Sequence, residues 1–129
     1  MMDENRAAEF TGRVLADSAA VATIVLAALG DRTGLFKDMI RLRADVLRID
    51  RDRFIDELRA RNVGTSVHFI PLHLHPYYQQ AWGYRPGQFP GTEAAWSGVV
   101  SLPLYPAMSD RDVDDVVAAV ADVTARYRR

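Results

Sequence analysis

Cysteine is absent from the 129-residue sequence. This absence excludes disulfide scaffolds, thiolate metal sites, iron–sulfur clusters and cysteine nucleophiles. Lysine is nearly absent too, because Lys37 is the single lysine among the sixteen basic residues. Any mechanism that needs a lysine amine, such as Schiff-base formation, therefore has one candidate.

An excess of either charge is also lacking. Sixteen Lys and Arg residues face seventeen Asp and Glu residues, and the formal net charge is −1. The two signs are interspersed, so the basic surface of a nucleic-acid-binding protein is missing and no nucleic-acid partner is expected. Hydrophobic residues make up 49% of the chain and charged residues 26%, which favours a packed domain over disorder.

Long apolar runs are missing as well. The most apolar stretch extends from Ser18 to Leu29, well short of the ~20 residues that span a bilayer. The segment before it contains Asp3, Glu4 and Glu9 where a signal peptide would carry positive charge. We therefore expect no membrane partner and a soluble, cytoplasmic protein.

The hydrophobic pattern predicts an α+β fold, with a small three-stranded, mainly antiparallel sheet, helices packed on one face and a long N-terminal helix before them. Apolar residues at helical spacing predict this helix over residues 4–29. Alternation predicts strands near residues 40–46, 63–69 and 99–102, and helical spacing predicts a helix over residues 51–61. Short helices are expected at 76–82 and 92–98. Ser109 and Asp112 form a capping box that begins the last helix.

Chemistry-bearing residues gather after the second predicted strand, where His68, His73 and His75 lie within one short segment. His73 and His75 form an H-x-H pair that suits a metal, but no cysteine or neighbouring carboxylate completes the site, so no metal is expected. General acid–base catalysis and contact with a bound ligand are two further interpretations. In the remaining one, the histidines only hydrogen-bond the loop backbone. Glycine-rich phosphate loops and nucleophile elbows are absent from the sequence, and no catalytic residue is predicted.

Four stretches together resemble one enzyme family. They read IDRDRFI at 49–55, VGTSVHFIPLH at 63–73, YRPGQFP at 84–90 and SLPLYPAMSD at 101–110. They resemble the C-terminal part of the DegT/DnrJ/EryC1/StrS aminotransferases, pyridoxal-phosphate enzymes that aminate keto-sugars attached to nucleotides. The resemblance implies that residues 40–129 form the small C-terminal domain of such an enzyme.

In that family a large domain carries the Schiff-base lysine, the acid that pairs with the pyridine nitrogen and most of the phosphate cup. Lys37 does not lie in the sequence context of that lysine, so the resemblance implies a truncated or chimeric chain that is inactive alone and binds no pyridoxal phosphate by itself. His68 and His73 match the loop that approaches the sugar. They are therefore the implied substrate-binding residues, toward a nucleotide-linked sugar that this chain would bind weakly if at all.

Residues 1–39 form a separate N-terminal helical segment in this interpretation. FTGRVLAD at 10–17 and AALGDRTGLFK at 27–37 resemble the N-terminal helices of class I S-adenosylmethionine methyltransferases. The two resemblances imply a junction near Met39–Ile40. One rival interpretation is a non-catalytic interaction module, in which the alanine-rich N-terminal helix pairs with a second copy to give a homodimer. The other is a methyltransferase-derived fragment.

Overall fold

A computed structural model describes residues 9–10, 12–14, 16, 21–23 and 39–129. The elements follow the chain in the order β1 (Val21–Thr23), β2 (Met39–Leu42), α3 (Arg51–Arg59), β3 (Ser66–Val67), the 3₁₀ turn η2 (Leu72–Leu74), α4 (Pro76–Trp82), α5 (Pro90–Gly98), β4 (Val99–Ser101) and α6 (Asp110–Arg126). The α+β class is confirmed, and the three strands predicted beyond residue 39 all form.

The sheet is antiparallel throughout, with the strand order β1-β2-β4-β3. Val100 of β4 lies opposite Ile40 on one side and Val67 on the other. The strand predicted over residues 63–69 is shorter than expected: β3 comprises only Ser66–Val67, which lie opposite Ser101 and Val100 of β4. Beyond Val67 the chain leaves the sheet.

The predicted N-terminal helix is wrong at Val21–Thr23. Residues 9–10, 12–14 and 16 are helical, but Val21–Thr23 form β1 and pair with β2. The β-branched residues Val21 and Thr23 lose rotamer freedom in a helix and favour a strand. The edge of β2 then offers hydrogen-bond partners to the backbone groups of β1. The rest of the predicted helix lies outside the described residues.

One core lies between the sheet and its helices. Its fully buried side chains come from the N-terminal helical residues, the sheet, α3 and α6, and include Phe10, Ile40, Phe54, Val100 and Val120. Phe10 thus lies in the same core as later residues, and β1 lies in the same sheet as later strands. The proposed domain division between residues 1–39 and 40–129 stays a prediction, which a chain beginning at Ile40 would test.

The last helix forms as its sequence predicts. The Ser109 hydroxyl accepts a hydrogen bond from the Asp112 amide at 3.2 Å, and the Asp112 carboxylate accepts one from the Ser109 amide at 2.8 Å. This reciprocal capping box satisfies two backbone donors that a helix start leaves free. The valines at helical spacing behind it face the core.

Glu57 connects α3 to the end of α6. Its carboxylate accepts hydrogen bonds from the Tyr127 hydroxyl at 2.7 Å, from Arg53 at 2.6 Å and from Arg61 at 3.0 Å. These donors, the Tyr127 hydroxyl first, lower the pKa of Glu57 to about 2. The carboxylate is therefore charged and fully hydrogen-bonded at neutral pH, which lets it lie at a nearly buried position.

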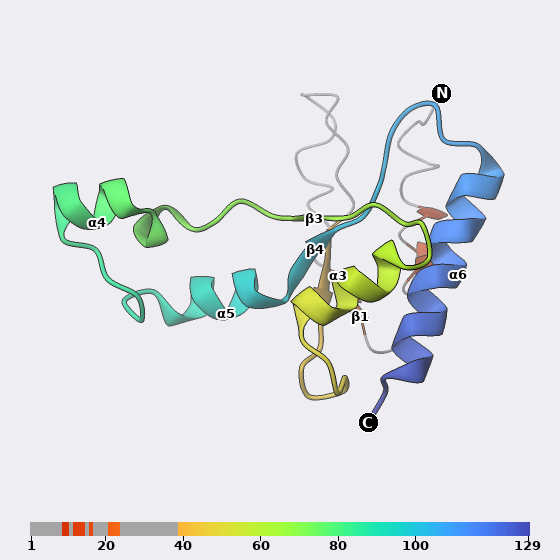
Figure 1. The fold of residues 1–129 in the computed structure, drawn as a ribbon, viewed down its shortest axis with the longest axis horizontal. Coiled ribbons are helices and arrows are strands. Elements are labelled where there is room, and N and C mark those ends of the chain that lie inside the picture. Colours follow the sequence, from red (N-terminus) through yellow and green to blue (C-terminus); the bar gives the residue numbers. More distant parts are fainter. Residues whose placement is uncertain (1–8, 11, 15, 17–20, 24–38) are drawn as a thin grey trace.

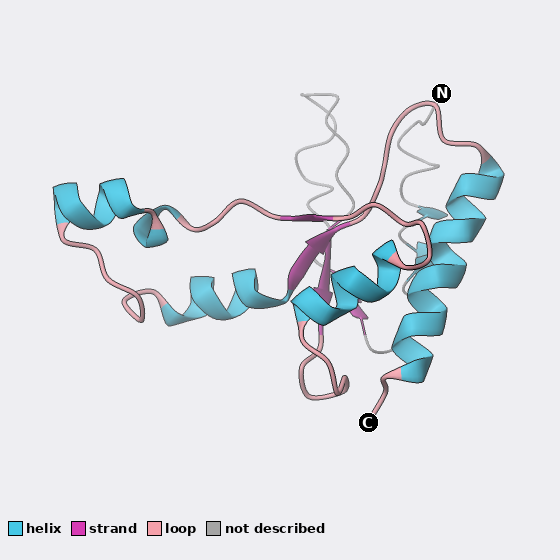
Figure 2. Cartoon of the chain, in the orientation of Figure 1, coloured by secondary structure: helices cyan, strands magenta, loops and turns pink. Residues whose placement is uncertain are grey.

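Residues 68–98, called the arm below, extend away from the sheet (Figures 1 and 2). The outgoing limb contains η2 and α4, and the returning limb contains α5. Both short helices were predicted, and α4 ends at Gly83, whose φ of 69° is left-handed and suits glycine. Within the described part of the chain, no helix is both long and apolar enough to cross a membrane.

Candidate functional site

The first candidate pocket lies where β3 ends and the arm begins. It has a volume of about 370 Å³ and is lined by Ser66, Val67, His68, Phe69, Ser101, Leu102 and Leu104. Two serines and one histidine thus line this pocket together with four apolar residues. His68 is the sequence-predicted residue that the structure places there.

The backbone of His68 is held by a side chain of the returning limb. The ladder between β3 and β4 ends at the pair Val67 and Val100. One residue further, the His68 carbonyl accepts a hydrogen bond from the Trp96 indole nitrogen at 3.1 Å. The Arg51 guanidinium lies 4.8 Å from the centre of the Trp96 ring and donates to the Trp96 carbonyl at 3.1 Å. The entry of the arm is thereby tied to α5 and α3.

His73 lies elsewhere, between the two limbs of the arm. It is 6% exposed, and its Nε2 is 2.9 Å from Oε1 of Glu93. The same carboxylate oxygen accepts a hydrogen bond from the Gly87 amide at 2.7 Å, and the Phe89 ring packs edge-on against the imidazole at 4.9 Å. The bond from His73 is the main cause that lowers the pKa of Glu93. His73 does not line the pocket of His68.

His75 serves the loop backbone. Its Nε2 lies 3.1 Å from the Ile70 carbonyl, which accepts the hydrogen bond. His75 therefore has the structural role in which a histidine hydrogen-bonds the backbone of its own loop. Among the described residues, no group of three His, Asp or Glu side chains could hold a metal ion. Lys37 lies outside the described residues.

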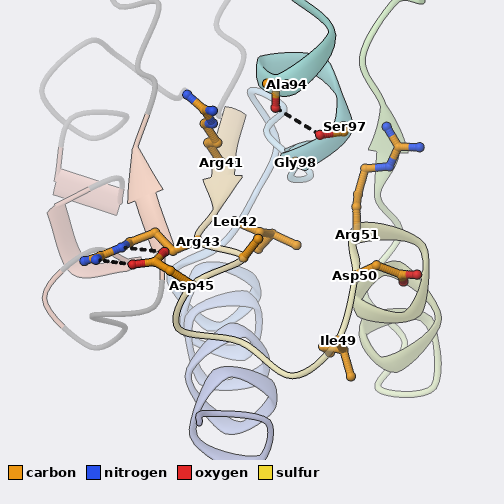
Figure 3. A pocket seen from close by; sticks show the side chains of 11 residues that line it. Arg41, Leu42, Arg43, Asp45, Ile49, Asp50, Arg51, Ala94, Ser97 and Gly98 are labelled. Carbon is orange, nitrogen blue, oxygen red and sulfur yellow. Dashed lines mark hydrogen bonds and ion pairs between the residues drawn. The ribbon is translucent and has the colours of Figure 1, made fainter. Parts of the chain in front are cut away.

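A second pocket, of about 570 Å³, lies between β2, the loop that follows it and α5 (Figure 3). In Figure 3 the Arg41 and Arg51 side chains extend toward the top of the view, whereas the Arg43 side chain points to the left and pairs with Asp45 at 2.8 Å. The bond from Arg43 lowers the pKa of the Asp45 carboxyl. This pocket contains basic and acidic groups but no histidine, and the sequence pattern did not indicate it.

Sequence reasoning missed Glu93 and Trp96, the two α5 residues that bind the histidine segment. A signal for them exists in principle. Residues three apart lie on the same face of a helix, and a sheltered tryptophan needs an acceptor for its indole N–H. The sequence does not reveal that their partners are the His68 carbonyl and the His73 imidazole, because these contacts join residues 28 and 20 positions apart.

The family comparison covers nearly the whole chain. The model of the DegT/DnrJ/EryC1/StrS aminotransferase family matches residues 2–121. This single match runs through the N-terminal segment and across Met39–Ile40. The predicted resemblance of residues 1–39 to a methyltransferase is therefore not supported, and neither is the gene junction derived from it. Two stretches as short as those at 10–17 and 27–37 do not identify a family.

Individual relatives agree with the family model. The spore coat polysaccharide biosynthesis protein SpsC of Bacillus subtilis is 51% identical over 76 residues, which are 58% of this chain and 20% of SpsC. The aminotransferase TlmJ of Streptoalloteichus hindustanus is 28% identical with a TM-score of 0.71, over 95% of this chain and 32% of TlmJ. The pyridoxal-phosphate form of the sugar aminotransferase Spr1654 of Streptococcus pneumoniae shares the fold, with a TM-score of 0.74 at 20% identity, over 95% of this chain and 31% of Spr1654.

The chain thus spans about a fifth of the curated relative and about a third of the two solved ones. The strands, the arm and α6 as far as residue 121 lie in one continuous family match. The chain belongs to the DegT/DnrJ/EryC1/StrS aminotransferase family.

Proposed function

We propose that this chain is the small, substrate-contacting domain of a pyridoxal-phosphate-dependent nucleotide-sugar aminotransferase, and that it does not transaminate by itself. The observation that carries the proposal is the pocket at the end of β3, where His68 and two serines lie within the family's own segment. The full reaction would move an amino group from an amino-acid donor to a keto-sugar.

The pocket suits part of a sugar nucleotide. The hydroxyls of Ser66 and Ser101 and the imidazole of His68 can bind sugar hydroxyls or phosphate oxygens, while Phe69 and Leu102 offer apolar contact. Its volume of about 370 Å³ lies near the lower end of ligand pockets. It therefore fits one portion of the substrate, and the remaining contacts must come from other polypeptide.

Pyridoxal phosphate does not fit the described residues. The cofactor needs a lysine amine for its aldehyde and a carboxylate for its ring nitrogen. The pocket of His68 has neither group, and the second pocket has carboxylates but no lysine. We therefore expect no cofactor on this chain alone and assign it no step of the cofactor's chemistry.

A titration tests the proposed substrate contact. Uridine diphosphate glucose is added while the ring resonances of the three histidines are followed by NMR. We expect shifts of His68 with a Kd near millimolar, which corresponds to about −4 kcal/mol. His75→Gln serves as the control variant, because His75 does not line the pocket and its ring contacts the Ile70 carbonyl and Tyr78.

The same titration tests the substrate role predicted for His73. A shift of His73 as large as that of His68 supports direct contact, whereas a shift confined to His68 removes His73 from the contact set. Silence of all three histidines contradicts the proposed function. Binding at micromolar concentration contradicts the view that only part of a site is present.

A second candidate function is a non-catalytic interaction module. It is favoured by the exposed apolar side chains of the arm and its entry: Val67, Phe69, Ile70, Leu72, Tyr77, Trp82 and Phe89. Light scattering after size exclusion tests for a homodimer, and Leu72→Ser should shift a dimer toward monomer. A homodimer through the N-terminal helix stays a separate prediction, tested by the same measurement on a chain beginning at Ile40.

A further inference from the structure

We infer that Glu93 and Trp96 are positioning residues, which hold the outgoing limb of the arm on α5 at two points and so set how His68 enters its pocket. The inference rests on the proposed function of that pocket. The inference goes beyond the proposed function, because it assigns a positioning role to two residues that do not line the pocket.

The first point of attachment takes the place of the backbone hydrogen bonds between β3 and β4. Val67 is the last residue of β3 with a partner in β4. His68 follows, and its carbonyl binds the Trp96 indole nitrogen at 3.1 Å. A partly buried backbone carbonyl needs a donor when a strand ends. Trp96 supplies this donor and fixes the peptide that carries the His68 side chain.

The second point is the contact between His73 and Glu93. The imidazole Nε2 and the Glu93 Oε1 are 2.9 Å apart, and the Gly87 amide donates to the same oxygen at 2.7 Å. Glu93 therefore joins the outgoing limb to the turn at the start of the returning limb. Glu93 and Trp96 are three residues apart, so both face the outgoing limb from one side of α5.

The helix that makes both contacts, α5, is itself held against α3 and β2. Arg51 of α3 donates to the Trp96 carbonyl and covers its ring, and the Arg51 side chain is only 12% exposed. Gly98 at the end of α5 approaches β2 so closely that a Cβ there would lie 3.2 Å from the Leu42 carbonyl oxygen. The position of His68 is thus set from the sheet and α3 through α5.

The test compares the two tryptophans of the chain. Trp96→Phe keeps an aromatic ring beneath Arg51 but removes the indole donor. Trp82→Phe is the matched control, because Trp82 is 59% exposed on α4. The readouts are residual dipolar couplings of the His68 and Phe69 amides, which report bond orientation and not ring current, together with the Kd for uridine diphosphate glucose.

We expect Trp96→Phe to change both couplings and to raise the Kd at least threefold, while Trp82→Phe changes neither. Unchanged couplings in Trp96→Phe would overturn the inference whether or not the ligand binds. If the wild-type chain binds no ligand, the proposed function fails, and the couplings alone still decide the positioning role.

Glu93 is tested by a pair of variants. Glu93→Ala removes the acceptor for His73 and Gly87, whereas Glu93→Gln keeps an acceptor oxygen. We expect the alanine variant to change the His68 couplings and the glutamine variant to restore most of them. The melting temperature should fall less than for a core substitution, because Glu93 lies outside the hydrophobic core. Equal couplings in all three proteins would contradict the second attachment.

Discussion

Val120→Ala is the most direct test of how α6 packs on the core. Val120 is 0% exposed and belongs to the core cluster, together with Phe54 of α3 and Val100 of β4. The substitution removes two buried methyl groups at about 0.8 kcal/mol each. The cavity left behind raises the loss of unfolding free energy to about 2–3 kcal/mol.

This loss is large against the ~5–15 kcal/mol that stabilises a typical domain. In a chain of this size it should lower the melting temperature by roughly 6–15 °C. Urea unfolding followed by circular dichroism measures it, and an unchanged m-value would show that only the stability changed. Val120→Asp should prevent folding altogether, because it buries an unpaired carboxylate.

The matched control is Val67→Ala, the same chemical change at a residue that is 44% exposed. Its cost should stay below about 1 kcal/mol, since exposed substitutions rarely cost more. Equal urea midpoints for the two variants would refute the packing of α6 described above.

Four further outcomes are expected. The stability that Glu57 contributes should be complete above pH 4.5 and be lost as the pH falls toward its folded-state pKa of about 2. Tyr127→Phe should weaken this acid dependence, because the Tyr127 hydroxyl is the main cause of the low pKa. Urea unfolding at pH 3 and at pH 7 measures the difference. Ser109→Ala should lower the unfolding free energy by about 1 kcal/mol through loss of the capping box, with Ser97→Ala as an exposed control. Reduction with borohydride in the presence of pyridoxal phosphate should give no stoichiometric adduct on Lys37 by mass spectrometry, and such an adduct would contradict the proposed lack of activity. Zinc should leave the melting temperature unchanged, and a rise abolished by substitution of any one histidine would restore the metal interpretation.

Much of the fold beyond residue 39 could be predicted from local pattern. The capping box at Ser109 and the valine spacing behind it specify α6 through contacts within one helix. Asp50 accepts the Arg53 amide and begins α3, and Asn62 adopts a φ of 60° just after the helix, as expected for a left-handed stop. Such features are readable because their partners lie within one or two turns of the chain.

The candidate site was only half predictable. Three histidines after a strand pointed to the segment where the candidate pocket lies, since sites often lie where strands end. The sequence could not separate their roles, however. His68 lines a pocket, His73 binds Glu93 and His75 binds the Ile70 carbonyl, and these differences follow from which residues α5 and the loop bring near each ring.

The sequence alone therefore determined the elements whose stabilising contacts are local: α3, α4, α5, α6 and the alternation that marks the strands. Tertiary structure alone decided that Val21–Thr23 become β1 within a segment of helical pattern, and that Trp96 replaces the ladder donor at His68. In both cases the deciding partner is a backbone group far along the chain. A strand edge or an unpaired carbonyl becomes available only once the sheet has formed, and the need to satisfy it then outweighs the small free-energy differences of local propensity.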